Sequence, residues 1–204
     1  MAVEDFFSAD GKAAVTHAVR DAEACTAAEV VVAVRRRAAT YRETEALAAF
    51  VVSVLTLAFL LFTPSPISTV TIPLRVVLAG GVGALLVAWA SPLKRALVPS
   101  ARRRGMVRLV ARAAFVDLGV SRTTGRTGVL VFVSAFERDV ELVADVNVDA
   151  KLLEPARAAL AAAVRAWDLD AFAAGVRAIG PALSKALPRA QDDVNELPDE
   201  PVQS

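Results

Sequence analysis

Side chains that act as nucleophiles or soft metal ligands are scarce in this chain of 204 residues, which has one cysteine and one histidine. A single cysteine excludes a disulfide bond within the chain. His17 and Cys25 would lie about 12 Å apart along one helix, too far for a nucleophile and its base. A zinc site needs several nitrogen or sulfur ligands, which the chain cannot supply. We therefore expect His17 to be a surface or packing residue, and the sequence identifies no catalytic residue.

The glycine-containing stretch TTGRTG at residues 123–128 lacks the final Lys-Ser/Thr pair of a Walker phosphate loop. A turn that leads into a strand is the simpler interpretation, and a backbone nest for phosphate is the alternative. Nucleic acid is not an expected partner. The arginines cluster around two apolar segments, where membrane topology and anionic lipid headgroups explain them.

Charge is almost absent from two long stretches. Residues 46–62 hold no charged side chain, and residues 72–90 hold only Arg75. A bilayer core needs about 20 mostly apolar helical residues, and each stretch reaches that length with its neutral flanks. A buried helical hairpin in a soluble core is the alternative, but neither stretch has a polar stripe at helical spacing. We expect a transmembrane hairpin closed by the uncharged turn at residues 63–71.

Lysine and arginine are concentrated at one end of this hairpin. The flanking cations are Arg35, Arg36, Arg37, Arg42, Lys94, Arg95, Arg102, Arg103, Arg104 and Arg108, and the turn has none. Cationic flanks stay cytoplasmic, so both termini should lie inside and the turn outside. No cleavable signal peptide is expected, and the first apolar segment would direct the chain to the membrane. Gly80, Gly81 and Gly83 should allow close approach of the two helices.

The remaining sequence predicts a small three-layer α/β domain, with helices on both faces of a sheet of about four strands, one of which cannot be placed. The expected strands begin at Glu29, at residue 128 and at residue 139, and the last two form an antiparallel hairpin. Helices are expected from Ser8 or Asp10 to residue 24, over residues 101–118, from Glu154-Pro155, and from Asp168 or Asp170, with an interruption at Gly180-Pro181.

Four segments follow from this pattern. Residues 1–45 form the first part of the domain, residues 46–93 the hairpin, and residues 94–187 the second part of the domain. Residues 188–204 are polar, acidic and proline-bearing, so we expect them to be disordered. Such a tail can dock on a partner and become ordered on binding.

Carboxylate and amide oxygens are the remaining candidate ligands for a metal ion. Asp145, Asn147 and Asp149 alternate after the second strand of the predicted hairpin, and Glu29 begins the first strand. In open α/β sheets, ligands gather outside strand ends. The spacing resembles the start of a loop for Ca²⁺ or Mg²⁺, although the glycine and distal glutamate of an EF-hand are absent. The favoured alternative is that both aspartates accept backbone N–H groups. Arg126 would neutralise Asp145 or bind an anion.

Two stretches resemble the TPM domain family. CTAAEVVVAV at residues 25–34 is similar to the opening of that domain, where a Thr-small-small-Glu step enters the first strand. TTGRTGVLVFVSAFERDVELVADVNVD at residues 123–149 is similar to its other half. In that half of the TPM domain, an Arg is followed by a strand that begins Gly-Val-Leu. The strand leads through a Glu-Arg turn to an Asp. NELPDEP at residues 195–201 resembles tails of bacterial membrane-bound members. The resemblance covers most of residues 1–187 outside the hairpin.

The resemblance implies a Rossmann-like α/β/α fold and a place in the bacterial inner (plasma) membrane. The family includes a thylakoid-lumen protein reported as an acid phosphatase, a photosystem II repair protein and a nematode receptor modulator. Those relatives are commonly exported, whereas this domain is expected in the cytoplasm, and here an insertion splits the domain.

Two functions remain. The first is a membrane-anchored interaction or scaffold module without a clear catalytic set. It would contact anionic lipid headgroups and another membrane or cytoplasmic protein. The alternative is a phosphatase that uses a divalent cation held by carboxylates near Asp145.

Overall fold

The computed structural model describes residues 3–64, 68–189 and 195–203. The chain forms two compact units. One consists of Met1–Ala38 with Arg104–Ser204, and the other is Ala39–Arg103. The second unit is therefore an insertion in the sequence of the first.

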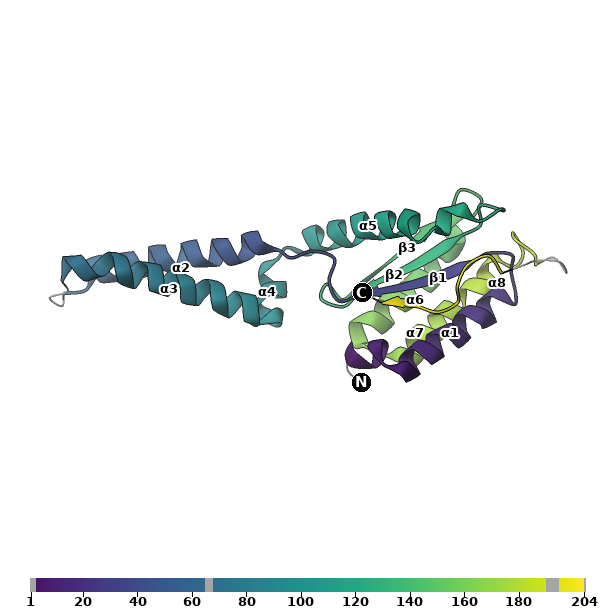
Figure 1. The fold of residues 1–204 in the computed structure, drawn as a ribbon, viewed down its shortest axis with the longest axis horizontal. Coiled ribbons are helices and arrows are strands. Elements are labelled where there is room, and N and C mark those ends of the chain that lie inside the picture. Colours follow the sequence, from purple (N-terminus) through teal and green to yellow (C-terminus); the bar gives the residue numbers. More distant parts are fainter. Residues whose placement is uncertain (1–2, 65–67, 190–194, 204) are drawn as a thin grey trace. The chain divides into compact units, whose positions relative to one another are not determined.

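Four strands form one mixed sheet in the first unit, in the order β3-β2-β1-β4 (Figure 1). They are β1 (Val30–Arg35), β2 (Val129–Ser134), β3 (Asp139–Ala144) and β4 (Val202–Gln203). β1 runs parallel to β2 and to β4, and β2 and β3 form an antiparallel hairpin. The predicted hairpin and the interior position of the first strand are confirmed. β1 and β2 pair in register, with Val32 opposite Val131, although the inserted unit separates them in the sequence.

Helices cover both faces of the sheet, as predicted (Figure 1). One face carries α1 (Ala9–Glu23), α6 (Glu154–Ala166), α7 (Leu169–Arg177) and α8 (Ile179–Leu183), and the other carries α5 (Ser100–Asp117). Short 3₁₀ turns lie at Val3–Phe7, Thr69–Thr71, Val120–Arg122 and Ala150–Leu153. The three-layer α/β/α arrangement is therefore confirmed.

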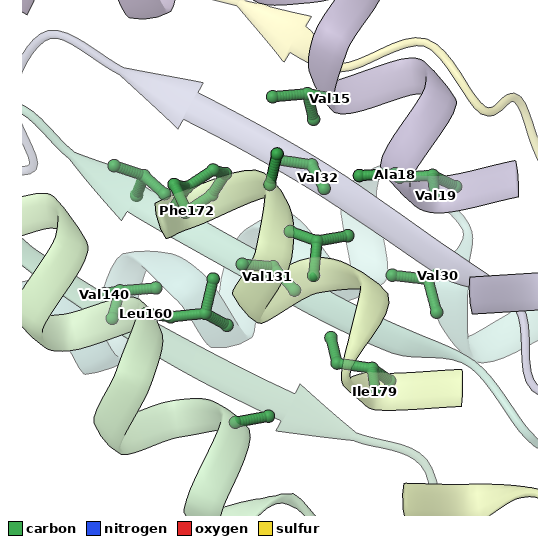
Figure 2. Close-up of a cluster of buried hydrophobic side chains, with 14 of the residues drawn as sticks. Val15, Ala18, Val19, Val30, Val32, Val131, Val140, Leu160, Phe172 and Ile179 are labelled. Atoms are coloured by element: carbon green, nitrogen blue, oxygen red, sulfur yellow. The ribbon is translucent and has the colours of Figure 1, made fainter. Parts of the chain in front are cut away.

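Side chains of β1 and β2 alternate between two apolar cores, because successive residues of a strand point to opposite faces. Val32 and Val131 lie in the core beneath α1, α6 and α7, which also holds Phe172 (Figure 2). Leu130 and Phe132 lie in the core beneath α5. Each fully buried side chain of this size stabilises the fold by about 1.5–3 kcal/mol. Burial on both faces explains why these strands are almost continuously apolar.

The helix starts follow the predicted capping residues. The Ser8 hydroxyl accepts a hydrogen bond from the Gly11 N–H at 2.9 Å, and the Asp168 carboxylate accepts one from the Ala171 N–H at 2.9 Å. Pro155 lies in the first turn of α6. There its missing N–H leaves no helical hydrogen bond unmade. The predicted interruption is present but lies at Ala178, between α7 and α8, whereas Gly180-Pro181, where it was expected, lie inside α8.

The C-terminal segment differs from its predicted disorder. Of residues 188–204, the described residues 195–203 lie on the first unit, and β4 pairs with Ala33 and Val34 of β1. β4 is thus the fourth strand that the sequence pattern could not place. Composition misses it because a strand of two residues has no periodicity, and its backbone hydrogen bonds come from a distant segment. Residues 190–194, also in the predicted tail, lie outside the described residues.

The inserted unit contains two long apolar helices, α2 (Arg42–Phe62) and α3 (Ile72–Trp89), and the short α4 (Ser91–Leu97). Both long helices have the length and apolar composition of membrane spans, and no described side chain of α2 is buried. α3 packs along α2. As predicted, glycines allow this approach, because Gly80 lies against Ser53 and Gly83 against Val52. Gly81 instead faces open space.

Two of the cations that flank the hairpin are paired with glutamates of α2. The Lys94 ammonium is buried and bonds to the Glu45 carboxylate at 2.5 Å. The exposed Arg102 guanidinium bonds to Glu43. The first pair joins α4 to the beginning of α2, so it connects the two ends of the hairpin.

Candidate functional site

Three loops meet at the end of the sheet where β1 and β2 begin and β3 ends. The Val129 N–H donates to the Glu29 carbonyl at 2.7 Å, and the Asp145 N–H donates to the Gly128 carbonyl at 2.9 Å. The Thr127 hydroxyl donates to the Ala27 carbonyl at 3.0 Å. All the residues selected from the sequence lie on these loops. Ligand sites of open parallel sheets lie at the carboxyl ends of the strands, whereas this end holds the amino ends of β1 and β2.

Asp145 and Arg126 form an ion pair at this end. The Arg126 Nη2 lies 3.0 Å from Asp145 Oδ1, and the side chain of Asp145 is only 2% exposed. The same oxygen accepts the Val146 N–H at 2.7 Å. Asp145 Oδ2 is buried and has no hydrogen-bond partner among the described residues. Arg126 therefore neutralises Asp145, which is one of the two roles that the sequence left open for it.

Asn147 and Asp149 point their polar groups to backbone atoms. The Asn147 amide donates to the Gly125 carbonyl at 2.8 Å, and Asp149 Oδ1 accepts the Lys151 N–H at 3.0 Å. Asp149 is thus the N-cap of the short turn that precedes α6. In the described part of the chain, no group of three or more His, Cys, Asp and Glu side chains is arranged to hold a metal ion. A Ca²⁺ or Mg²⁺ site at Asp145, Asn147 and Asp149 stays a prediction.

Glu29 lines a separate polar cavity of about 170 Å³, together with Arg20, Glu23, Thr26, Arg189, Asn195 and Asp199. Its Oε2 accepts the Leu197 N–H at 3.3 Å. Glu29 therefore contacts the C-terminal segment.

Glu23 is a buried carboxyl at the end of α1 that was not among the residues selected from the sequence. Its Oε1 accepts the Val30 N–H at 2.8 Å, at the point where β1 begins. Burial, together with the negative charges of Glu29 and Asp199, raises the pKa of Glu23 from 4.5 to about 7. The spacing of apolar residues along α1 does not indicate that Glu23 is buried. Glu23 is the last residue of α1, and it is covered by the chain that turns back to form β1.

Glu137 marks the opposite end of the sheet, in the turn between β2 and β3. Its carboxylate is buried and accepts the Ala38 N–H at 3.1 and 3.2 Å and the hydroxyl of Ser134. Ala38 is the last residue of the first unit before the inserted unit. The Glu-Arg turn that supported the TPM resemblance thus fixes the chain where it leaves the domain. No catalytic role was predicted for it.

The only histidine and cysteine of the sequence do not form a reactive pair. His17 Nδ1 lies 3.1 Å from Asp21 Oδ2, and the side chain of His17 is 74% exposed. Asp21 also bonds to Arg177 Nε at 2.9 Å. His17 is therefore a surface residue, which is one of the two roles expected for it, and it contacts the carboxylate of the Asp21–Arg177 ion pair. Cys25 is exposed.

Comparison with known proteins supports the fold. No protein-family model matches the chain, and no curated protein matches it. Among solved structures, the NMR structure of the BA42 protein from the psychrophilic bacterium Bizionia argentinensis is similar. The TM-score is 0.59 at 18% sequence identity, and the match covers 100% of this chain and 99% of BA42. BA42 is a TPM-domain protein. At this identity the similarity shows that the two proteins share a fold.

Proposed function

We propose that the chain is a membrane-anchored interaction module of the TPM type, with its α/β domain on the cytoplasmic side of the bacterial plasma membrane. The observation that carries the proposal is the apolar surface of the inserted unit. Leu55, Phe59 and Leu78 are 64%, 69% and 59% exposed on α2 and α3. Contiguous apolar surface of this kind is stable in lipid, where two helices satisfy all their backbone groups.

Charge supports the orientation. Arg42 and Arg102 flank the hairpin and are exposed. The turn between the helices has no Lys or Arg, so the positive-inside rule favours a cytoplasmic domain. We propose that the exposed arginines contact anionic lipid headgroups, each contributing about 1 kcal/mol to membrane association.

The second part of the proposal is that the anchored α/β domain binds another protein. The α/β domain exposes isolated apolar side chains, among them Val116 of α5 and Val146 of the loop after β3, which are 55% and 76% exposed. A photo-crosslinking amino acid at either position, in membranes from growing cells, should give discrete adducts with another protein. The same probe at Val70, in the turn of the hairpin, is the matched control and should not give those adducts. Extraction of the chain by alkaline carbonate, or no adduct from either domain position, would contradict the proposal.

A second candidate is a phosphatase that depends on a divalent cation. It rests on Asp145 Oδ2, a buried oxygen without a hydrogen-bond partner in the described chain. A cation there would polarise a phosphoryl oxygen. The purified protein should then hydrolyse an aryl phosphate only with Mg²⁺ or Ca²⁺, and Asp145→Asn should lower the rate at least about a hundredfold. Activity that survives both Asp145→Asn and Asp149→Asn would remove this site from consideration.

A further inference from the structure

The C-terminal segment, residues 195–203, lies along the sheet as a peptide ligand would. Its main chain pairs in the parallel sense with the edge of β1, with Val202 opposite Ala33 and Gln203 opposite Val34. The Gln203 amide donates to the Phe6 carbonyl at 2.9 Å. Addition of a strand to an open sheet edge is a common mode of peptide recognition, in which main-chain pairing gives affinity and side-chain pockets give specificity.

Acidic side chains of the C-terminal segment meet matching groups of the domain. Asp199 Oδ2 accepts a hydrogen bond from Arg20 Nε of α1 at 2.7 Å. Glu196 Oε2 accepts the Thr124 N–H at 2.9 Å and the Thr124 hydroxyl at 3.1 Å. Leu197 packs against the core beneath α5. The domain thus contacts three side chains along one extended segment, namely the acidic Glu196, the apolar Leu197 and the acidic Asp199.

The domain covers the same segment only in part. β4 has two residues, and Asn195, Glu196, Pro198 and Glu200 are exposed. Asp199 also lines the polar cavity beside Glu23 and Glu29. Its negative charge opposes ionisation of Glu23. Covalent attachment compensates for weak contacts, because a tethered segment binds at an effective concentration in the millimolar range.

We propose that the edge of β1 is a binding site for an acidic, extended segment of another protein, and that the C-terminal segment occupies this site in cis until it is displaced. The proposal deepens the proposed function, on which it rests, by naming the class of partner. A suitable segment carries an acid opposite Arg20, an apolar residue in the place of Leu197 and an acid opposite the Thr124 N–H. A second copy of this chain is a poor occupant, because its identical segment gains nothing over the tethered one.

Equilibrium binding of a labelled peptide tests this site directly. The peptide NELPDEPVQ, residues 195–203, is added to the full-length protein in detergent and to a chain ending at Arg189, and fluorescence anisotropy is measured. We expect saturable binding to the shortened chain and at least tenfold weaker binding to the full chain, whose own segment competes. A peptide with Asp199→Arg is the matched control and should bind the shortened chain about tenfold more weakly. An Arg20→Glu substitution in the shortened chain should reverse that preference.

Two results with the shortened chain would overturn the proposal. One is the absence of saturable binding to a shortened chain that keeps the circular dichroism and melting transition of the full chain. The other is unfolding of the shortened chain, because a segment that the domain needs in order to fold is not a replaceable ligand. The full-length Asp199→Arg variant is a second test, and it should bind the wild-type peptide more tightly than the full wild-type chain does. Unchanged binding there would also contradict displacement. If the crosslinks in membranes form but the peptide does not bind the shortened chain, this site alone is overturned and the proposed function still holds.

Discussion

Gly83 of α3 lies so close to Val52 of α2 that a Cβ atom on Gly83 would come within 2.7 Å of the Val52 Cγ2. The other Val52 side-chain atoms nearby are its Cβ and Cγ1, at 3.0 and 3.4 Å from the same point. A valine is stiff about χ1, so its branched end cannot rotate away without strain. This contact and that of Gly80 with Ser53 are points of close approach between the two helices.

Gly83→Ala should therefore destabilise the hairpin, by about 1–3 kcal/mol from overpacking. Gly81→Ala is the matched control, because a Cβ there meets nothing within 4 Å. The control should be neutral or stabilising, since alanine favours a helix by about 1 kcal/mol over glycine. Melting temperatures of the two variants in detergent compare them. Equal melting temperatures would show that the helices do not pack through Gly83.

The raised pKa of Glu23 predicts that the stability of the folded protein depends on pH. Its pKa is raised from 4.5 to about 7 in the folded state, so the folded protein binds the proton more tightly than the unfolded chain. The stabilisation is complete below pH 4.5 and is lost as the pH rises through about 7, at a cost of about 3 kcal/mol. Glu23→Gln keeps an oxygen for the Val30 N–H and cannot ionise.

The difference in unfolding free energy between Glu23→Gln and wild type should grow from near zero at pH 4.5 to a plateau above pH 7. Urea titrations at several pH values measure it. The chain has two tryptophans, of which Trp167 is buried in the α/β domain and Trp89 lies in α3. A Trp89→Phe background lets fluorescence report on the domain alone. A difference that does not vary with pH would contradict the assignment.

Glu137 should contribute to the stability of the α/β domain. Its buried carboxylate accepts hydrogen bonds from the Ala38 N–H and from Ser134. Glu137→Ala leaves those donors without a partner and should cost about 2–3 kcal/mol in the same urea assay. Glu154→Ala is the control, because the side chain of Glu154 is 63% exposed and its nearest cation, Arg157, lies 3.6 Å away. A loss at Glu137 no larger than at Glu154 would show that Glu137 does not hold the turn.

The fold was predictable where a pattern is local. Residues 30–34 and 129–133 are apolar at successive positions, a pattern typical of a strand buried on both faces. Ser8 and Asp168 are capping residues directly before amphipathic helices. β4 was not predictable, because a two-residue strand exists only through its pairing with β1.

The sequence predicts that Asp145, Asn147 and Asp149 lie at one end of the sheet, but it does not predict the bonds that their side chains make. The spacing of Asp145, Asn147 and Asp149 looks like one ligand set in a linear sequence. The backbone turns between them, so that Asp145 bonds to Arg126, Asn147 to Gly125 and Asp149 to the start of a helical turn. Glu23 was missed because its burial depends on the chain that folds back over it.

Cysteine labelling tests the proposed membrane topology of the chain. The native Cys25 is the only cysteine of the chain, and it is exposed on the α/β domain. The partner variant is Cys25→Ser with Ser68→Cys, which moves the thiol to an exposed position between the two long helices. A third variant, Cys25→Ser with Lys185→Cys, provides a second exposed position on the domain.

The cells are first treated to make any outer membrane permeable while the inner membrane stays intact. A membrane-impermeant maleimide is then added to these cells and, separately, to lysed cells. We expect Ser68→Cys to be labelled in intact cells, whereas Cys25 and Lys185→Cys should be labelled only after lysis. Labelling of Cys25 and Lys185→Cys from outside, with Ser68→Cys protected until lysis, would contradict the cytoplasmic placement of the α/β domain.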